Sequence, residues 1–306
     1  MTAAPITARI LADSINEGGD RLTTFEWTYP RMIHSEIMTH GALRRNSASS
    51  RAIPAKTLRE RTLAAPAYPG SWGANQKGMQ AENEVADIAA AELWWNNGLE
   101  MMAKHHKLGE DMGLHKQVVN RVIEPWMMIT IIISATDWTN FFHLRMHKDA
   151  EPSFQRLARA AWEAYHANLP TVRAIGDWHL PLLDDAERDV WGTGLGRKIS
   201  TGRCARVSYL THEGHRDPGQ DLILHDRLIG AGDEGGPMHL SPFEHPCEAT
   251  KPGERIGPFT GWKQYRKFFV NEAGPAIKSK CVRCGCWDGR HVKKCPNDFQ
   301  TKLFED

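Results

Sequence analysis

The chain has 306 residues, with 38 Lys and Arg against 37 Asp and Glu, and 41% of its residues are hydrophobic. That length allows one sizeable core or two modest ones. The balanced charge argues against a protein that coats nucleic acid, so we expect a small-molecule partner and no stable nucleic-acid complex. There is no signal-peptide pattern, and the longest apolar run, residues 126–135, is shorter than the ~20 residues of a membrane helix. We therefore expect a cytoplasmic protein without a membrane partner.

Two strands and five helices are expected in the first half of the chain. β-branched and aromatic residues predict a strand over residues 22–29, and the run 127–134 predicts a second, buried strand. Helices are predicted over residues 30–40, 79–109, 115–123, 137–145 and 152–167. Gly41 is expected to end the first helix in the left-handed conformation, and the helix 79–109 is expected to pack on the core.

The second half is predicted to be less regular. Mixed Pro, Gly, Asp and Trp indicate a connector over about residues 169–200, and an apolar-periodic segment follows at residues 220–232. The chain is therefore expected to be α+β, with a main domain over residues 1–270 and a polar, Cys-rich tail over residues 271–306.

The loop "MTHGALRRNSASSRAIP", residues 38–54, gathers Ser, Asn and Arg side chains around a glycine. Such side chains and successive backbone N–H groups can form an anion site, and Arg51 can offer a bidentate guanidinium to a phosphate. A solvated turn has the same composition. Arg121 and Arg145 are each compatible with a surface ion pair or with a polar pocket.

Other parts of the sequence carry weaker signals. His239, Glu244 and His245 flank a proline turn, and no HExxH, GxSxG, Walker or GxGxxG pattern supports a protease, hydrolase, ATPase or Rossmann dehydrogenase. In the tail, Cys281, Cys284 and Cys295 can form a structural zinc site with either His291 or Cys286. Reduced, solvent-facing thiols are the alternative.

Four stretches taken together resemble the flavin-dependent thymidylate synthases, the ThyX family, in a virus-type form. Thr-His-Gly followed by "RRNSASSR" is similar to that family's signature, and residues 120–152 resemble its "ARxxLP…NFLxLR…AQxEI" segment. "RCARVSY" and "SPFEH", at residues 203–209 and 241–245, resemble stretches that precede the signature in the family but follow it in this chain. The resemblance therefore spans about residues 25–266 in circularly permuted order, and it does not cover the Cys-rich tail.

The resemblance implies a fold of mixed helices around an antiparallel sheet and a homotetramer with active sites between subunits. It implies one-carbon transfer to C5 of dUMP, with FAD carrying hydride, methylenetetrahydrofolate giving the carbon and NADPH reducing the flavin. For a bacteriophage protein the location would be the cytoplasm of the bacterial host.

The resemblance also assigns site residues. It implies a nucleotide site formed by Glu36, Ser47, Ala48, Ser49, Ser50, Arg51, Arg121 and Arg145, with Ser49 and Arg145 taking part in catalysis. It implies flavin contacts from Thr39, His40, Arg44, Asn46, Ser134, Asn140, Ser208 and His245, with His245 near the folate side.

The front of the loop departs from the family pattern. Gly41 stands where the family has its second signature Arg, and Arg44 stands where it has Ser. Three hypotheses remain: a thymidylate synthase with a relocated guanidinium, a pyrimidine nucleotide hydroxymethylase acting on dUMP or dCMP, and a non-catalytic nucleotide or nucleic-acid binder.

Overall fold

The computed structural model describes residues 4–209, 217–230, 238–269 and 272. The chain divides into two compact units, Met1–Phe269 and Val270–Asp306. The proposed zinc ligands Cys281, Cys284, Cys286, His291 and Cys295 lie outside the described residues, so the zinc site stays a prediction. Within the described part, no helix has the length and hydropathy needed to cross a membrane.

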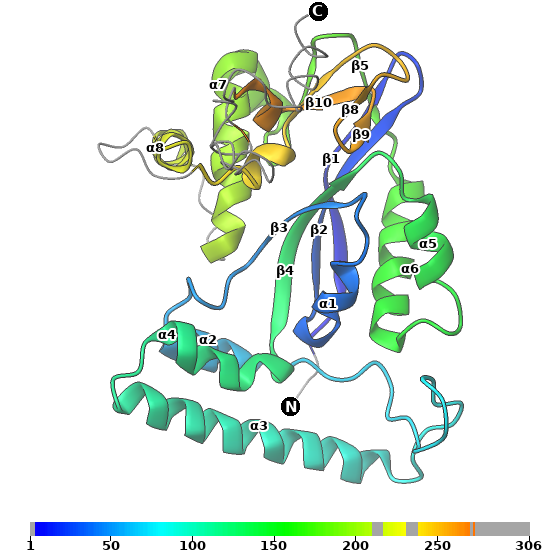
Figure 1. The fold of residues 1–306 in the computed structure, drawn as a ribbon, viewed down its shortest axis with the longest axis vertical. Coiled ribbons are helices and arrows are strands. Elements are labelled where there is room, and N and C mark those ends of the chain that lie inside the picture. Colours follow the sequence, from blue (N-terminus) through cyan, green and yellow to red (C-terminus); the bar gives the residue numbers. More distant parts are fainter. Residues whose placement is uncertain (1–3, 210–216, 231–237, 270–271, 273–306) are drawn as a thin grey trace, which may run out of the picture. The chain divides into compact units, whose positions relative to one another are not determined.

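A five-stranded sheet forms the centre of the first unit, as Figure 1 shows. Its strand order is β3-β4-β2-β1-β5. The strands are β1 (Thr7–Asn16), β2 (Arg21–Pro30), β3 (Arg44–Ser47), β4 (Met128–Ala135) and β5 (Thr171–Arg173). Every neighbouring pair is antiparallel except β1 and β5, which are parallel. The predicted α+β class and both predicted strands, now β2 and β4, are confirmed.

The central strand β4 is covered on both faces, which explains its almost uninterrupted apolar sequence. Ile129, Ile131 and Ile133 enter the main aromatic core. Ile132 points to the opposite face, where it packs with Cys204 and Val207. Each face is therefore closed by a different part of the chain.

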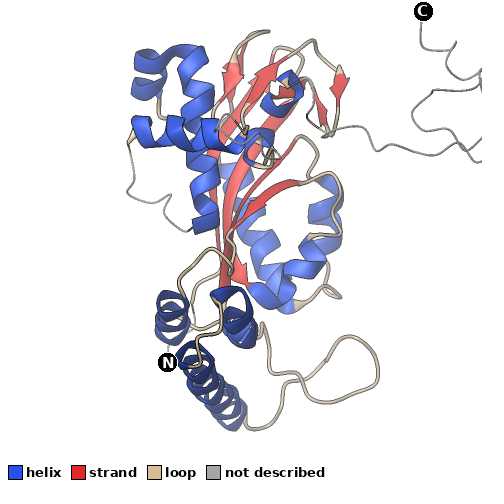
Figure 2. Ribbon diagram, turned by 60° about the vertical axis from the view of Figure 1, so that its left-hand side comes forward, coloured by secondary structure: helices blue, strands red, loops and turns tan. Residues whose placement is uncertain are grey.

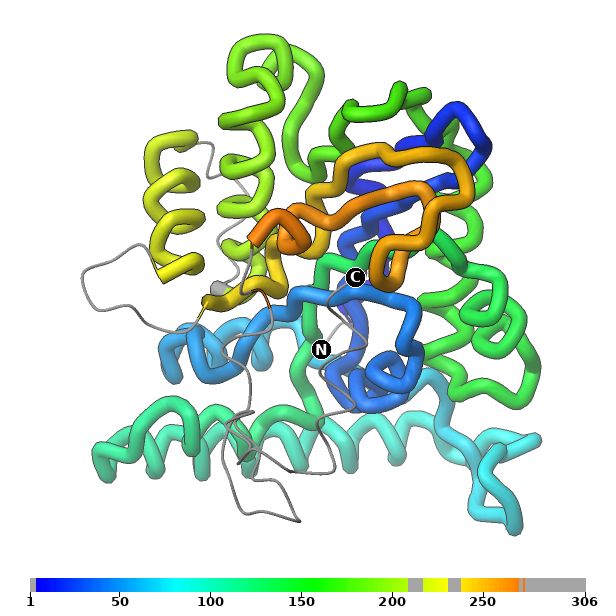
Figure 3. Tube along the Cα trace, turned by 45° about the horizontal axis from the view of Figure 1, so that its top comes forward, coloured from blue at the N-terminus to red at the C-terminus, as the bar shows by residue number. Residues whose placement is uncertain are grey.

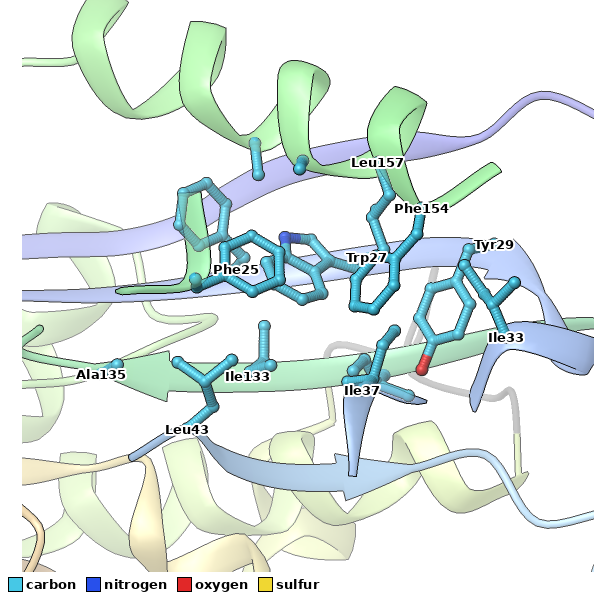
Figure 4. Packing of buried hydrophobic residues seen from close by; sticks show 14 of the residues in the cluster. Phe25, Trp27, Tyr29, Ile33, Ile37, Leu43, Ile133, Ala135, Phe154 and Leu157 are labelled. Carbon is cyan, nitrogen blue, oxygen red and sulfur yellow. The ribbon is translucent and has the colours of Figure 1, made fainter. Parts of the chain in front are cut away.

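Helices α5 (Thr139–Arg145) and α6 (Pro152–Ala167) close the first face. Their side chains, with Phe25 and Trp27 of β2, form the cluster drawn in Figure 4. The α6 helix begins where Glu151 accepts a hydrogen bond from the Phe154 backbone and Pro152 takes the first turn. Two short turns, η1 (Arg31–Ile33) and α1 (His34–Ile37), add Ile33 and Ile37 to this core.

A separate group of helices lies at one end of the sheet, below the strands in Figure 2. It contains α2 (Ala55–Ala64), α3 (Ile88–Asp111), α4 (Lys116–Val119) and the 3-10 turn η2 (Asn120–Trp126). Their shared apolar cluster is Ile53, Leu58, Ile123 and Met127. Helix α3 starts at Ile88, nine residues later than the predicted start at residue 79. Its N-cap is Asp87, whose side chain accepts a hydrogen bond from the Ala90 backbone N–H. The predicted core packing of α3 is correct for Leu99 but wrong for the exposed Ile88 and Leu93.

The opposite face is covered by the C-terminal part of the first unit. This part contains α7 (Asp185–Arg206), η3 (Val207–Tyr209), α8 (Pro218–Leu228), η4 (Pro242–Glu244) and η5 (Tyr265–Phe268). It also contains a three-stranded sheet of β6 (Trp178–His179), β7 (Cys247–Ala249) and β10 (Trp262–Gln264), and a hairpin of β8 (Arg255–Ile256) and β9 (Phe259–Thr260). Figure 3 shows β3 running beside η4.

A buried ion network ties α7 to α8. Arg203 is 1% exposed and bonds Glu187 at 2.6 Å and Asp221 at 3.0 Å. The helices approach closely because residue 202 is glycine: a Cβ there would lie 2.3 Å from the Asp221 carbonyl oxygen. Arg203, in the stretch "RCARVSY", therefore holds two helices together.

Two local predictions were wrong. The helix expected over residues 30–40 is only the two short turns η1 and α1, and Gly41 does not have the left-handed backbone expected of it. The connector expected over about residues 169–200 contains two short strands and most of α7. Helix α7 starts at a capping box of Asp184 and Glu187 and is interrupted at Gly192, where φ is 57°.

Candidate functional site

Four of the predicted site residues meet at the C-terminal end of α5. The Nε of Arg145 donates to Nε2 of His40 at 2.8 Å, and its Nη1 donates to Glu36 at 3.2 Å. Its Nη2 lies 3.4 Å from the Thr39 hydroxyl. The guanidinium stacks over the Phe154 ring at 4.4 Å. This group is called the Arg145 cluster; it joins residues more than 100 positions apart in the sequence.

The chemistry of Arg145 fixes the protonation of His40. A guanidinium N–H can only donate, so Nε2 of His40 accepts and its proton resides on Nδ1. Burial is the main cause that lowers the pKa of His40 to about 4, and the neighbouring Arg145 and Arg45 guanidiniums contribute to the same shift. His40 is therefore a neutral acceptor at neutral pH.

A cleft of about 180 Å³ opens beside the Arg145 cluster. Its lining includes Thr39, His40, Asn140 and Arg145, and also Gly41 and Ala42. A larger cavity of about 590 Å³ shares Gly41 and Ala42 with this cleft and has Arg44 in its wall. Two predicted flavin residues thus line neighbouring cavities: Asn140 lines the smaller cleft and Arg44 the larger cavity, and Gly41 and Ala42 line both.

The middle of the loop is held against the segment around η3. The buried Asn46 side chain donates to the Cys204 carbonyl at 2.8 Å, and the Ser49 backbone N–H donates to the Ser208 carbonyl at 3.1 Å. Ala48 is buried and donates its N–H to Thr130 at 2.9 Å. Ser47 is half-buried at the end of β3, and Arg51 is exposed. The structure therefore brings two distant matching stretches side by side, with Arg51 directed to the surface.

A carboxylate that the sequence reasoning did not identify bonds two of the residues predicted to form the nucleotide site, Ser50 and Arg121. Glu124 Oε1 accepts from Ser50 at 2.9 Å and from Arg121 at 2.9 Å. Arg31 lies 3.1 Å from the same oxygen. Arg31, Arg121 and Glu124 line a cavity of about 500 Å³. The resemblance did assign Arg121, but Arg31 stands in no matching motif and Glu124 stands where the family pattern has Leu.

A chain of five buried side chains crosses the opposite face of the sheet. Ser14 bonds His179 Nδ1 at 2.9 Å, and His179 Nε2 bonds Thr24 at 2.8 Å. Thr24 bonds Ser134 at 2.6 Å, and Ser134 bonds His245 Nδ1 at 2.8 Å. Each member is at most 1% exposed. We call it the buried chain; its five members come from five separate segments of the sequence.

Both histidines of the buried chain are neutral. Burial lowers the pKa of His245 to about 3, and burial is also the main cause that lowers the pKa of His179 well below its usual value. Sequence matching identified Ser134 and His245 but missed Ser14, Thr24 and His179. No local pattern marks these three, because their role depends on long-range pairing of strands.

Eight buried side-chain polar atoms have no hydrogen-bond partner among the described residues, and two of them belong to predicted flavin contacts: Nε2 of His245 and Nε of Arg44. Buried polar atoms in proteins almost always have partners, so unpaired ones often mark a place where a ligand supplies them. Arg44 also lines the 590 Å³ cavity, whose other walls carry further cations. This donor set fits a large anionic cofactor such as FAD.

The sixteen predicted active-site residues outside the tail thus fall into separate neighbourhoods. Thr39, His40, Asn140 and Arg145 line one cleft, and Glu36 bonds Arg145. Ser50 and Arg121 share Glu124, and Ser134 and His245 belong to the buried chain. In the described part of the chain no cluster of His, Cys, Asp or Glu has the arrangement of a metal site.

Comparisons with known proteins gave weak similarities. No family model matches the sequence, and no curated protein matches it. Among solved structures, the chain is similar to PolB, a UMP/dUMP methylase from Streptomyces cacaoi bound with 5-Br dUMP, with 13% identity, coverage of 54% of this chain and 90% of that one, and a TM-score of 0.42. It is also similar to ThyX from Helicobacter pylori complexed with FAD and dUMP, with 19% identity, coverage of 47% and 67%, and a TM-score of 0.33. At these TM-scores the function has to be argued from the residues of this chain.

Proposed function

We propose that the chain is an enzyme that transfers a one-carbon unit to C5 of a pyrimidine deoxynucleotide, converting dUMP to dTMP. In this proposal methylenetetrahydrofolate gives the carbon, NADPH is the reductant, and FAD when bound carries hydride between them. The observation that carries the proposal is the Arg145 cluster. Thr39 and His40 come from the loop motif and Arg145 from a second matching segment. Together with Glu36, which precedes the loop motif, they meet through hydrogen bonds in the folded chain.

Arg145 is the residue proposed to act on the pyrimidine. As C5 of the ring becomes nucleophilic, negative charge develops on the ring, and a fixed cation beside it stabilises that charge. Glu36, His40 and the Phe154 ring hold the guanidinium in one orientation, so little reorganisation is needed during the reaction. Because His40 is neutral, it orients Arg145 without adding a competing positive charge.

The nucleotide phosphate is proposed to bind at the other end of the loop. Arg121 and Arg31 face a 500 Å³ cavity and now share the Glu124 carboxylate, and Ser50 bonds the same carboxylate. A phosphate could take over these donors, because its geometry matches a guanidinium as well as a carboxylate does. Ser49 and the exposed Arg51 extend this end of the loop.

His245 is proposed to present its unpaired Nε2 to the cofactor. If Ser134 donates to Nδ1, Nε2 carries the proton and is a donor; this direction continues along the buried chain, with His179 donating from Nε2 to Thr24. Neutral histidines at both positions fit this arrangement.

The separation of these neighbourhoods supports the predicted homotetramer. Arg51 projects to the surface while the Arg145 cluster lies at the end of α5, so we propose that a second subunit brings complementary loop residues together. The fold of the family and its permuted order remain part of the same proposal.

The test is a product assay. Purified protein is incubated with dUMP or dCMP, FAD, methylenetetrahydrofolate and NADPH, and the nucleotide is identified by mass. We expect dTMP from dUMP. A hydroxymethyl product, or a product from dCMP alone, would show that the protein is a pyrimidine nucleotide hydroxymethylase instead of a thymidylate synthase. No product and no flavin uptake would favour the non-catalytic nucleotide or nucleic-acid binder.

The variant that tests the role of the Arg145 cluster is Arg145→Lys. It keeps the charge but cannot bond His40 and Glu36 at once. We expect kcat to fall at least ~100-fold, as for loss of a preorganised charge stabiliser. His143→Ala, an exposed change on the same helix, should leave kcat within about twofold.

A further inference from the structure

A line of polar side chains runs from the helices at the end of the sheet to the Ser- and Arg-rich loop. Arg59 of α2 bonds Nδ1 of His106 of α3 at 3.1 Å, and Nε2 of His106 bonds Oδ1 of Asn120 at 3.0 Å. The Asn120 amide nitrogen then donates to the Ser50 carbonyl at 2.6 Å and to the Ile53 carbonyl at 3.0 Å. His106 and Asn120 are fully buried. We call Arg59, His106 and Asn120 the helix–loop bridge.

The chemistry of its two ends fixes the direction of every hydrogen bond in the bridge. A guanidinium only donates, so Nδ1 of His106 accepts, and the proton of the neutral ring resides on Nε2. Burial is the main cause that lowers the pKa of His106, as a neutral ring requires. At the other end the two loop carbonyls only accept, so Asn120 turns its NH2 group to them and its oxygen to His106. Glu110, which also pairs with Arg59, lies at the solvent end and changes none of these directions.

Ser50 is held at both of its polar ends by positions that depart from the family pattern. Asn120 and Glu124 stand where "ARxxLP" has Ala and Leu. Asn120 bonds the Ser50 carbonyl, whereas Glu124 accepts from the Ser50 hydroxyl at 2.9 Å. The Ala and Leu of the pattern could form neither bond. The loop of this chain is therefore fixed by side-chain contacts that the family pattern does not supply.

The two contacts of Ser50 differ in how readily a ligand can replace them. Glu124 lies beside the partly exposed Arg121, where a phosphate can take the place of the carboxylate. Asn120 is buried and has partners for both its oxygen and its nitrogen, so breaking its hold on the backbone is costly. Lys116 fixes a further loop carbonyl, that of Ala52, at 2.8 Å. The backbone thus stays in place while the Ser50 hydroxyl can change partner.

We propose that His106 and Asn120 are positioning residues that hold residues 49–51 in place for the phosphate of a pyrimidine nucleotide. This inference rests on the proposed function, because the two residues act through its phosphate site without touching the ligand. A segment that is ordered before binding loses less conformational entropy when the ligand arrives. Loss of the bridge should therefore weaken nucleotide binding more than it slows the chemical step.

The test compares KM and kcat for dUMP in the product assay with the Kd for dUMP from calorimetry, all on the full chain. Asn120→Leu keeps the size of the side chain but cannot bond the two carbonyls. His106→Leu breaks the bridge one step earlier, whereas His106→Gln can still accept from Arg59 and donate to Asn120. Leu99→Ala, a buried change on the same helix as His106, is the matched control for lost stability, which urea denaturation measures.

We expect Asn120→Leu and His106→Leu to raise the KM and Kd for dUMP at least ~10-fold, the size of a buried hydrogen bond left unpaired. In both variants kcat should stay within about threefold of the unaltered chain. His106→Gln should restore the affinity that His106→Leu loses, to within about threefold. Leu99→Ala should lower the free energy of unfolding and leave the KM for dUMP within about twofold.

The outcomes separate this inference from the proposed function. If Asn120→Leu forms dTMP with an unchanged KM, loses only kcat, or raises KM no more than Leu99→Ala does, the positioning role is overturned and the reaction stands. If dUMP affinity depends on Asn120 and His106 in a chain that forms no dTMP, the positioning role is supported and the reaction is overturned. An unaltered chain that binds no dUMP would overturn both.

Discussion

Charged side chains around the loop are matched by partly exposed counter-charges, whereas the buried chain beneath the sheet is made of neutral groups. Arg121 is half-exposed and shares Glu124 with Arg31 and Ser50. In contrast, Ser14, His179, Thr24, Ser134 and His245 are at most 1% exposed and pair only through neutral hydrogen bonds.

This difference in burial and charge separates two functions, ligand recognition at the loop and structural support by the buried chain. A partly exposed ion pair contributes little to stability, so an incoming phosphate can replace one partner at small cost. A buried neutral network is costly to interrupt, because each atom left unpaired keeps its desolvation penalty. Ligand recognition is therefore placed where contacts exchange easily, and the fixed orientation of His245 is placed where they do not.

The largest expected effect is on the buried chain. His179→Ala removes the link between Ser14 and Thr24 and leaves a cavity, so the free energy of unfolding should fall by about 2–4 kcal/mol. Urea denaturation measures it, with the exposed His166→Ala as the control. A loss below about 1 kcal/mol would show that the buried chain is not a stabilising network.

Acid should weaken the fold through the same histidines. The unfolded imidazoles bind a proton near pH 6.5, whereas the pKa of folded His245 is about 3, so below pH 6.5 the unfolded state holds more protons and stability falls as pH falls. Each such histidine contributes up to ~1.4 kcal/mol per pH unit in that window. His245→Gln should show a shallower decline between pH 6.5 and 4.5; an identical slope would contradict a neutral, buried His245.

Near the loop, the negative charge of Glu124 can be removed with little loss in the free energy of unfolding. Glu124→Gln frees Arg121 and Arg31 from a shared carboxylate, so the affinity for dUMP should rise several-fold while the free energy of unfolding changes by less than ~1 kcal/mol. Calorimetry with dUMP measures the first quantity. Glu110→Gln, which breaks a comparable pair between Glu110 of α3 and Arg59 of α2, should leave dUMP affinity unchanged. Weaker dUMP binding by Glu124→Gln would mean that the carboxylate positions the cations instead of competing for them.

The smallest effect is expected at Gly41. Its backbone is not left-handed and its Cβ position is open, so Gly41→Arg should change the free energy of unfolding by less than ~0.5 kcal/mol. In an Arg44→Gln background the same change should recover part of the FAD affinity. Gly202→Ala provides the contrast, because its Cβ would meet the Asp221 backbone and should destabilise measurably. A large loss at Gly41 would mean that the open space is needed for the fold.

Local signals in the sequence were sufficient for some elements and insufficient for others. The strands β2 and β4 and the helices α5 and α6 follow from β-branched runs, aromatic periodicity and proline at a helix start, all of which act within a few residues. Helix α7 was missed because Gly192, Gly194 and Gly196 hide its helical pattern, although the capping box at Asp184 was present.

The candidate site shows the same limit. Glu36, His40 and Arg145 were found because they stand in recognisable motifs, and the structure joins them. His179 stands in no motif, and Glu124 departs from the family pattern at its position. Each acquires its role from a partner more than 70 positions away. Only tertiary structure places such residues.

The pairing of β4 with β2 has a consequence for how the chain folds. Thr24 is opposite Ser134 and Phe25 is opposite Ile133. Sliding β4 by one residue would turn Ser134 into the aromatic core and an isoleucine toward His245. The slip would therefore bury a hydroxyl in the apolar core and remove the hydrogen-bond partner of His245 on the other face. The hydroxyl of Ser134 thus helps to specify the register of β4. A sheet with shifted register can still bury apolar residues, but it cannot form the hydrogen bonds of Ser134 with Thr24 and His245 that stabilise the native register.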